Sequence, residues 1–149
     1  MAERELPMEL FLSYRELYQE WRGLLRTCAQ EAQLSELQLI VLKMLNAHSE
    51  LGVNAVATAV MCSQSQASMI ITQLSELGLV ERMRSDTDRR RVHLRVTSEG
   101  VARLALIFGP NSLLMNTIVR VFSLPEAELE DLLRLNRIVM RNLQLEGVN

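Results

Sequence analysis

Apolar side chains recur every three or four residues along most of the chain, which is the spacing of one face of an α-helix. The longest such stripe lies between Glu9 and Ala32 and predicts a long first helix. Later stripes predict shorter helices, separated by glycine, proline and polar residues. These helices are expected from Ser35 to about His48, from Ala55 to Val60, from Ser63 to Leu77, from Thr97 with an interruption near Gly109 and Pro110, and from after Ser123 to about Leu143.

Cap residues mark several of the expected helix ends. Ser35 with Gln38, and Ser63 with Gln66, each have the spacing of a capping box, in which each of two side chains accepts a hydrogen bond from the other residue's backbone amide. Gly78 is placed to end its helix in the left-handed conformation. Further helix starts are expected at Asn54, at Thr97, and at Ser123 before Pro125.

The period changes from helical to alternating after Gly78. Residues 79–84 and 91–96 alternate apolar and polar side chains on either side of the polar stretch 85–90, which predicts a two-stranded ribbon. The fold class is therefore predicted to be mainly α with a small β-ribbon wing (α+β). Two short helices, a tight turn and a ribbon together form a winged helix-turn-helix. In that geometry the second helix enters the DNA major groove and the wing reaches phosphates or the minor groove.

Charge is distributed unevenly along a chain whose length suits one domain. The 149 residues carry a net charge of −2, which by itself gives no reason to expect a nucleic-acid partner. Between Arg82 and Arg95, however, six arginines stand against two aspartates, a local charge of +4. The remainder therefore carries −6. Clustered guanidinium groups on a ribbon tip are suited to binding phosphate.

Several of these segments carry motifs of a known family. They are Leu34–Gln38, Cys62–Ser65, Leu74–Arg82, Asp88–Arg90 and Leu94–Gly100. From Leu34 to Gly100 the chain resembles the MarR family (multiple-antibiotic-resistance regulators). The resemblance implies a homodimer in which residues 1–33 and 101–149 form a helical dimerisation region within a single domain, 1–149. It also implies that residues 34–100 bind double-stranded DNA at a pseudo-palindromic operator, usually as a repressor relieved by a ligand or an oxidant.

The resemblance assigns roles to the second helix and to the wing. Arg90 stands where the family has a wing-tip arginine in the minor groove, and Asp88 where an acid braces the wing. The other wing arginines would be phosphate ligands or wing supports: Arg82, Arg84, Arg89 and Arg91. The second helix would be the recognition helix, with base readout by Gln64, Ser65, Ser68, Met69, Thr72 and Gln73.

The expected recognition helix departs from the family in one respect. The segment Ser63–Leu77 contains no lysine or arginine, whereas family members often carry a basic residue near the position of Met69. Glutamine pairs with adenine, and methyl groups touch the methyl group of thymine. The operator is therefore expected to be rich in A·T pairs, and the affinity to depend on the wing arginines.

Two alternatives to this function are open from the sequence. The wing arginines could dock an acidic protein partner instead of DNA. The protein could also sense oxidants through Cys62 or Cys28, although the position of Cys28 on an apolar stripe favours a buried small side chain. Trp21, Met44 and His48 are candidates for a pocket that takes a small aromatic effector, with core or dimer packing as the alternative.

Other classes of protein are not supported by the sequence. It contains no nucleophile and base pair and no glycine-rich phosphate loop, so an enzyme is not expected. The two cysteines and two histidines lack the spacing of a metal site, and no cofactor is expected. The acidic N-terminal segment is unlike a signal peptide, so we expect a cytoplasmic protein without a membrane span.

Overall fold

The computed structural model describes residues 2–84 and 92–147. The chain forms two compact units, Met1–Met115 and Asn116–Asn149. The elements of the first unit are α1 (Ala2–Glu31), α2 (Glu36–Ala47), α3 (Val53–Ala59), α4 (Gln64–Glu76), β1 (Val80–Arg84), β2 (Val92–Val96) and α5 (Ser98–Phe108). The helix α6 (Leu113–Val121) crosses the boundary between the units, and α7 (Glu126–Leu145) belongs to the second.

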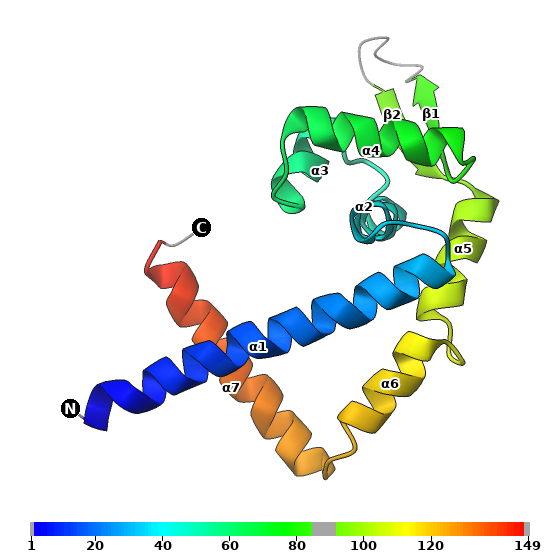
Figure 1. Cartoon of the computed structure of the whole chain (residues 1–149). Coiled ribbons are helices and arrows are strands. Elements are labelled where there is room, and N and C mark those ends of the chain that lie inside the picture. Colours follow the sequence, from blue (N-terminus) through cyan, green and yellow to red (C-terminus); the bar gives the residue numbers. More distant parts are fainter. Residues whose placement is uncertain (1, 85–91, 148–149) are drawn as a thin grey trace. The chain divides into compact units, whose positions relative to one another are not determined.

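The winged helix-turn-helix predicted from the sequence is present in the first unit. In Figure 1, α2 is seen almost end-on, with α4 on one side and α1 on the other, and the two strands lie next to α4. The core of this unit is made by apolar side chains from every helix and from the ribbon. Those most deeply buried include Cys28, Leu39, Val41, Leu42, Leu45, Val56, Ile71, Leu74 and Leu79.

Both predicted capping boxes are confirmed. The Ser35 hydroxyl accepts from the Gln38 amide at the start of α2, and Ser63 and Gln66 form the same pair at the start of α4. Gly78 has a positive φ of 71°, as expected for the residue that ends α4. These local signals fix where the two helices of the helix-turn-helix begin and where the second one stops.

Two of the expected caps are wrong. The N-cap of α3 is Gly52 in an extended conformation, so Asn54 lies inside the first turn and its carbonyl accepts from the hydroxyl of Thr58. The N-cap of α7 is Pro125, whose carbonyl accepts the first backbone hydrogen bonds of the helix, and no side chain caps this end. Ser123 instead lies in the turn that precedes it.

The base of the ribbon is closed against the start of α5. The strands are antiparallel, with Val80 opposite Val96 and Arg84 opposite Val92. Thr97 caps α5 by accepting from the amide of Gly100, and its own hydroxyl donates to the carbonyl of Gly78 at 2.6 Å. A Cβ at Gly100 would lie 2.3 Å from the carbonyl oxygen of Leu79, so only glycine allows this approach.

Each unit also has large apolar side chains that are exposed to solvent rather than packed in this core. The first half of α1 exposes several large side chains, among them Leu6, Met8 and Phe11. The helix α7 has no buried residue. Its apolar positions nevertheless follow a helical stripe: Leu129, Leu132, Leu133, Val139, Met140 and Leu143.

One segment has the length and the apolar composition of a membrane-spanning helix, Ser98–Val121, with a mean hydropathy of 1.3. The segment is divided between α5 and α6 by residues 109–112, with Gly109 as the C-cap of α5. A helix whose apolar face binds a second protein chain passes the same test of length and composition. This feature is therefore weak support for a membrane span.

Candidate nucleic-acid interface

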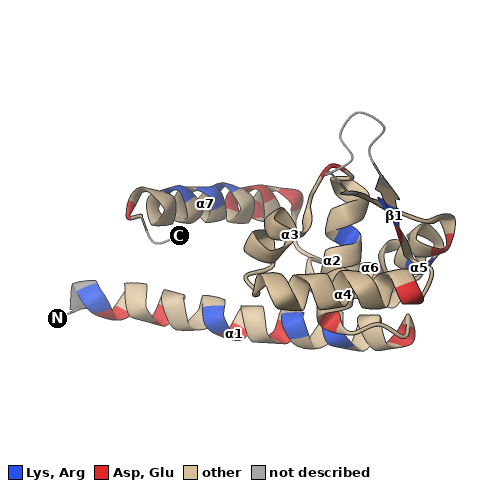
Figure 2. Cartoon of the chain, turned by 90° about the horizontal axis from the view of Figure 1, so that it is seen from above, with Lys and Arg blue, Asp and Glu red and all other residues tan. Residues whose placement is uncertain are grey.

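The exposed face of α4 is polar and carries no positive charge. Ala67, Ile71 and Leu74 point into the core, which turns the opposite side of the helix to solvent. Figure 2 shows α4 without a blue residue and with a red one only near its C-terminal end. Of the six predicted base-reading residues, four lie in the N-terminal half of this helix. Gln64, Ser65 and Met69 are exposed, and Ser68 is half-buried.

The other two predicted base readers are held by the protein itself. The Thr72 hydroxyl donates to the carbonyl of Ser68 at 2.9 Å and accepts from Nη2 of Arg82 at 3.0 Å. The side chain of Gln73 is half-buried, and its Oε1 accepts from Nε2 of Gln38 at 3.0 Å. The C-terminal half of α4 is therefore fastened to β1 and to α2, whereas the N-terminal half is open.

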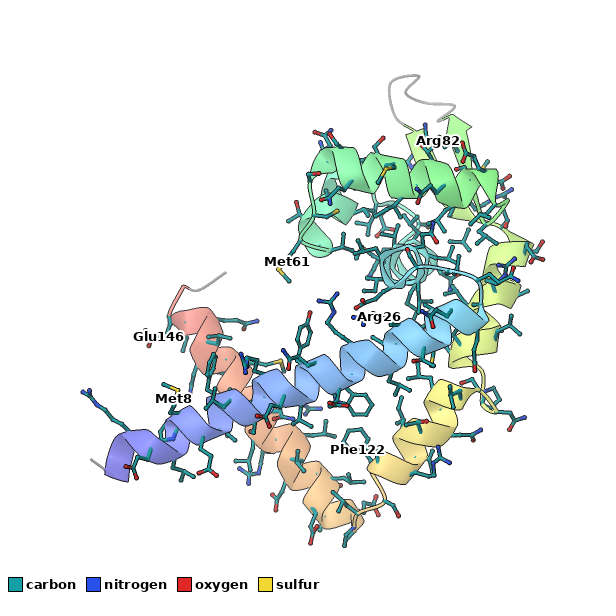
Figure 3. All side chains as sticks on the ribbon, viewed as in Figure 1. Met8, Arg26, Met61, Arg82, Phe122 and Glu146 are labelled. Carbon is teal, nitrogen blue, oxygen red and sulfur yellow. The ribbon has the colours of Figure 1, made fainter. Side chains whose placement is uncertain are left out.

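Two of the arginines in the basic segment are engaged on the ribbon. Arg82 lies on β1 beside α4, as Figure 3 shows, and uses one donor for Thr72. A guanidinium group has five donors, so Arg82 keeps others for a phosphate. Arg95 forms an ion pair across the ribbon with Glu81. The positive charge of Arg95 is thus compensated within the wing, while that of Arg82 is not paired with a carboxylate among the described residues.

The remaining predicted wing residues cannot be placed. Arg84 ends β1, and its side chain is outside what the structure describes. Asp88, Arg89, Arg90 and Arg91 lie in the segment 85–91, outside the described residues. The described ladder ends with Arg84 opposite Val92, at the end of the ribbon away from α5.

Sequence reasoning missed a set of polar contacts at the first turn of α2. Nε and Nη2 of Arg22 donate to the carboxylate of Glu36, at 2.7 and 3.0 Å, and Arg26 lies 3.9 Å from the same group. These hydrogen bonds lower the pKa of Glu36 and raise that of Arg22. The residues look like ordinary surface charges in the sequence, because nothing in their spacing shows that α1 crosses the start of α2 at this point.

The candidate effector and redox residues have ordinary environments. Trp21 and Met44 are half-buried, and His48 is the exposed C-cap of α2, with Nδ1 3.9 Å from Glu50. Cys28 is buried, and this burial raises the pKa of its thiol. Cys62 is half-buried at the turn before α4, and its Sγ lies 3.5 Å from the carbonyl of Ser63. No cluster of three or more metal-ligating side chains occurs in residues 2–84 and 92–147.

Comparison with known proteins supports the same region and the same fold. The profile of the winged helix DNA-binding domain family matches residues 34–100. The *Staphylococcus aureus* MarR structure in complex with salicylate and kanamycin superposes with a TM-score of 0.77 at 17% identity, covering 99% of this chain and 98% of that one. The chain has the fold of the MarR family. The resemblance drawn from the sequence motifs and the predicted fold class are thereby confirmed.

Two further relatives of this MarR fold are informative. The *S. aureus* MepR–DNA complex matches with a TM-score of 0.69 at 20% identity, covering 89% of this chain and 96% of that one. The HTH-type transcriptional regulator FarR of *Neisseria gonorrhoeae* is 29% identical over 75 residues, 50% of this chain and 51% of FarR. The chain thus matches about half the length of that regulator. MepR was solved in complex with DNA, and FarR is described as a transcriptional regulator.

Proposed function

We propose that the protein is a homodimeric transcriptional regulator that binds a pseudo-palindromic operator in double-stranded DNA, acting as a repressor. The observation that carries the proposal is the open polar half of α4 next to an arginine-rich wing, within a matched winged helix DNA-binding domain. In this arrangement α4 enters the major groove by its N-terminal end, and the wing contacts the backbone and the minor groove.

The proposed DNA contacts divide between base reading and phosphate binding. Gln64 and Met69 are the exposed side chains of α4 best suited to adenine and to the thymine methyl group, with Ser65 and Ser68 beside them. Because α4 has no lysine or arginine, phosphate binding rests on the wing. Its proposed members are Arg82, Arg84, Arg89 and Arg91 at phosphates, Arg90 in the minor groove, and Asp88 as a brace.

Dimerisation is proposed from the apolar surface outside the winged helix. In the second unit, Phe122, Leu129, Leu132 and Leu133 line a hollow of about 300 Å³ together with Asn136. An amphipathic helix whose stripe stays in water is not stable on its own. A second copy of the chain supplies the same kind of surface from its own helices, as a two-fold interface requires.

A small aromatic effector and a cytoplasmic location complete the proposal. The *S. aureus* MarR structure holds salicylate, which supports an aromatic ligand for this protein as well. Trp21 and Met44, half-buried on α1 and α2, and the exposed His48 are the residues we propose for its pocket. We place the protein in the cytoplasm because the relatives that it resembles are regulators from bacteria, in which DNA lies in the cytoplasm.

The proposal is tested by titrating labelled duplex DNA at several salt concentrations. We expect affinity to fall linearly on a log–log plot against salt, and Arg90→Ala to weaken operator and random DNA alike while reducing the slope by about one. Arg26→Ala, an exposed arginine on α1, is the matched control and should leave the slope unchanged. Unchanged affinity for Arg90→Ala would remove that assignment. Absence of any DNA shift at low salt would favour the acidic protein partner instead.

A further inference from the structure

One glutamine in the first turn of α2 joins this helix to α4. Gln38 accepts at Oε1 from the backbone amide of Ser35 at 2.9 Å, which completes the capping box. Its other end, Nε2, donates to Oε1 of Gln73 on α4 at 3.0 Å, in a half-buried position. Both ends of the Gln38 amide are therefore used, one within α2 and one across to the recognition helix.

The second capping box shows that the cross-helix bond is not a consequence of capping. Gln66 occupies the same position in α4 as Gln38 does in α2, and it accepts from the amide of Ser63 at 3.1 Å. The same Oε1 also accepts from the hydroxyl of Ser63 at 3.2 Å, and the residue is exposed. The same motif thus caps one helix only, whereas at Gln38 it also reaches a neighbouring helix.

Thr72, the residue before Gln73, is held by a hydrogen bond from the wing. Thr72 accepts from Arg82 on β1, so two consecutive residues of α4 are tied to α2 and to the wing. The helix is free of such ties near Gln64, nine residues earlier. At a rise of about 1.5 Å per residue, a tilt of roughly 5° about Gln73 moves Gln64 by about 1 Å. A displacement of that size misaligns hydrogen bonds to base edges.

The same turn of α2 is fastened to α1. Glu36 stands two residues before Gln38, and its carboxylate, 12% exposed, accepts both hydrogen bonds from Arg22. Arg26, one turn further along α1, lies near the same carboxylate without a hydrogen bond to it. A shift of α1 therefore acts on the first turn of α2, and the Gln38 amide connects that turn to α4.

We propose that Gln38 and Gln73 are positioning residues for DNA recognition. The hydrogen bond between their side chains forms a joint between α2 and α4, and the Arg22–Glu36 pair links this joint to α1. The inference rests on the proposed DNA-binding function. It changes the role of Gln73, which sets the angle of α4 rather than reading a base. It also gives α1 a route to the recognition helix that does not pass through the wing.

The decisive variants exchange amides for carboxylates. In Gln38→Glu the capping bond is kept, and the amide of Gln73 rotates to donate, so the cross-helix bond survives. In Gln73→Glu the donor of Gln38 still has an acceptor. In the double variant two carboxylates face each other, and we expect operator affinity at pH 8 to fall at least about tenfold beyond the sum of the single effects.

A matched control carries the same two charges without the facing pair. Gln38→Glu combined with Gln66→Glu keeps the second charge on α4 but moves it to the capping box at the start of that helix. The effects of these two substitutions on operator affinity should be additive. Lowering the pH from 8 to 6 should restore the operator affinity of the Gln38→Glu, Gln73→Glu double variant more than that of this control. The reason is that two carboxylates close together take up a proton more readily than separated ones. The native charged groups around the joint are Glu36, Arg22 and Arg82. The pKa of Glu36 is lowered and that of Arg22 is raised by their mutual hydrogen bonds, so neither of these two groups titrates over that range.

The alternative role of Gln73 gives a different pattern. A base reader loses discrimination at one base pair when changed to Met, while a positioning residue loses affinity across the half-site. Preference altered at a single base pair, together with additivity between Gln38→Glu and Gln73→Glu, would overturn the proposal. Equal effects of Arg22→Ala and Arg26→Ala on operator affinity would remove the link to α1, because we expect a loss of about threefold or more only for Arg22→Ala.

A measurement without DNA separates this proposal from the proposed function. The urea midpoints of the free protein, its two single variants and the facing double variant should be non-additive, with the double variant lower than expected. If the native protein fails to bind DNA, the proposed function fails. The urea midpoints still show whether Gln38 and Gln73 are coupled in the free protein. Additive midpoints would overturn the joint itself.

Discussion

The winged helix region buries its apolar side chains, whereas α7 leaves its apolar side chains exposed. In residues 34–100, Leu39, Leu42 and Ile71 are at most 1% exposed, and they pack on each other's elements within one unit. In α7 no residue is buried, and Leu132 and Leu133 are 43% and 56% exposed. The first region is stabilised by its own core. The second exposes an apolar stripe, which we propose is covered by a second copy of the chain.

The largest expected effect is on association through α7. We predict that Leu132→Glu raises the dimer dissociation constant at least about a thousandfold, since an unpaired charge is buried twice in a two-fold interface. Sedimentation at micromolar concentration should show a monomer, with operator binding weakened in parallel.

The control for this variant lies on the same helix, outside the stripe formed by Leu129, Leu132, Leu133, Val139, Met140 and Leu143. Asn142→Glu introduces the same charge away from the apolar stripe and should stay dimeric. A dimer that tolerates Leu132→Glu would show that the stripe of α7 is not the interface, and the contrast with the winged helix region would lose its explanation.

The next effect concerns the self-contained core. Leu42 is fully buried at the centre of the helix-turn-helix, so Leu42→Ala should lower the free energy of unfolding by about 2–5 kcal/mol. The fraction of dimer in the folded protein should not change. Urea denaturation at several protein concentrations distinguishes the two regions, because a loss that depends on concentration would place Leu42 in the interface instead.

The winged helix region was also the part best predicted from the sequence. Its helix starts are set by neighbouring residues, as in the two capping boxes, and its ribbon by alternation, so local pattern was sufficient. The start of α3 was misplaced because Gly52 serves as N-cap through its backbone alone, which leaves no side-chain signal. Pro125 capped α7 in the same way.

The candidate site was predicted less well than the fold. The spacing of apolar residues indicated which face of α4 is turned to solvent, but it could not separate Gln64, which is exposed, from Gln73, which is bonded to Gln38. Both are glutamines on one helix, and the difference arises only from where α2 passes. The same holds for Glu36, whose partner Arg22 is 14 residues away on another helix.

A smaller effect is expected from the pair that links α1 to α2. Its hydrogen bonds from Arg22 hold the pKa of Glu36 below the ordinary value. The ionised form therefore stabilises the fold above the unfolded pKa of about 4.3, and that stabilisation is lost as the pH falls through the lowered folded pKa. Glu36→Gln should unfold at lower urea than the native protein at pH 7, and the gap should close in acid.

The comparison residue for this test is Glu20 on α1. It is exposed and has no ion pair among the described residues, so Glu20→Gln should show little difference from the native protein at either pH. A gap for Glu36→Gln that is the same at pH 7 and in acid would mean that packing, rather than charge, holds α1 against α2.

The smallest effect is expected from the two thiols. Cys28 is 1% exposed where the end of α1 joins the core of the winged helix region. Burial raises the pKa of its thiol, and the negative charge of Glu31 raises it further, so little thiolate forms at neutral pH. We expect Cys28 to react with a thiol reagent only on unfolding, and peroxide to change operator affinity by less than about twofold. Cys62, half-buried beside the cap of α4, is the control: reaction there first, with release of DNA that Cys62→Ser abolishes, would make the turn before α4 an oxidant sensor.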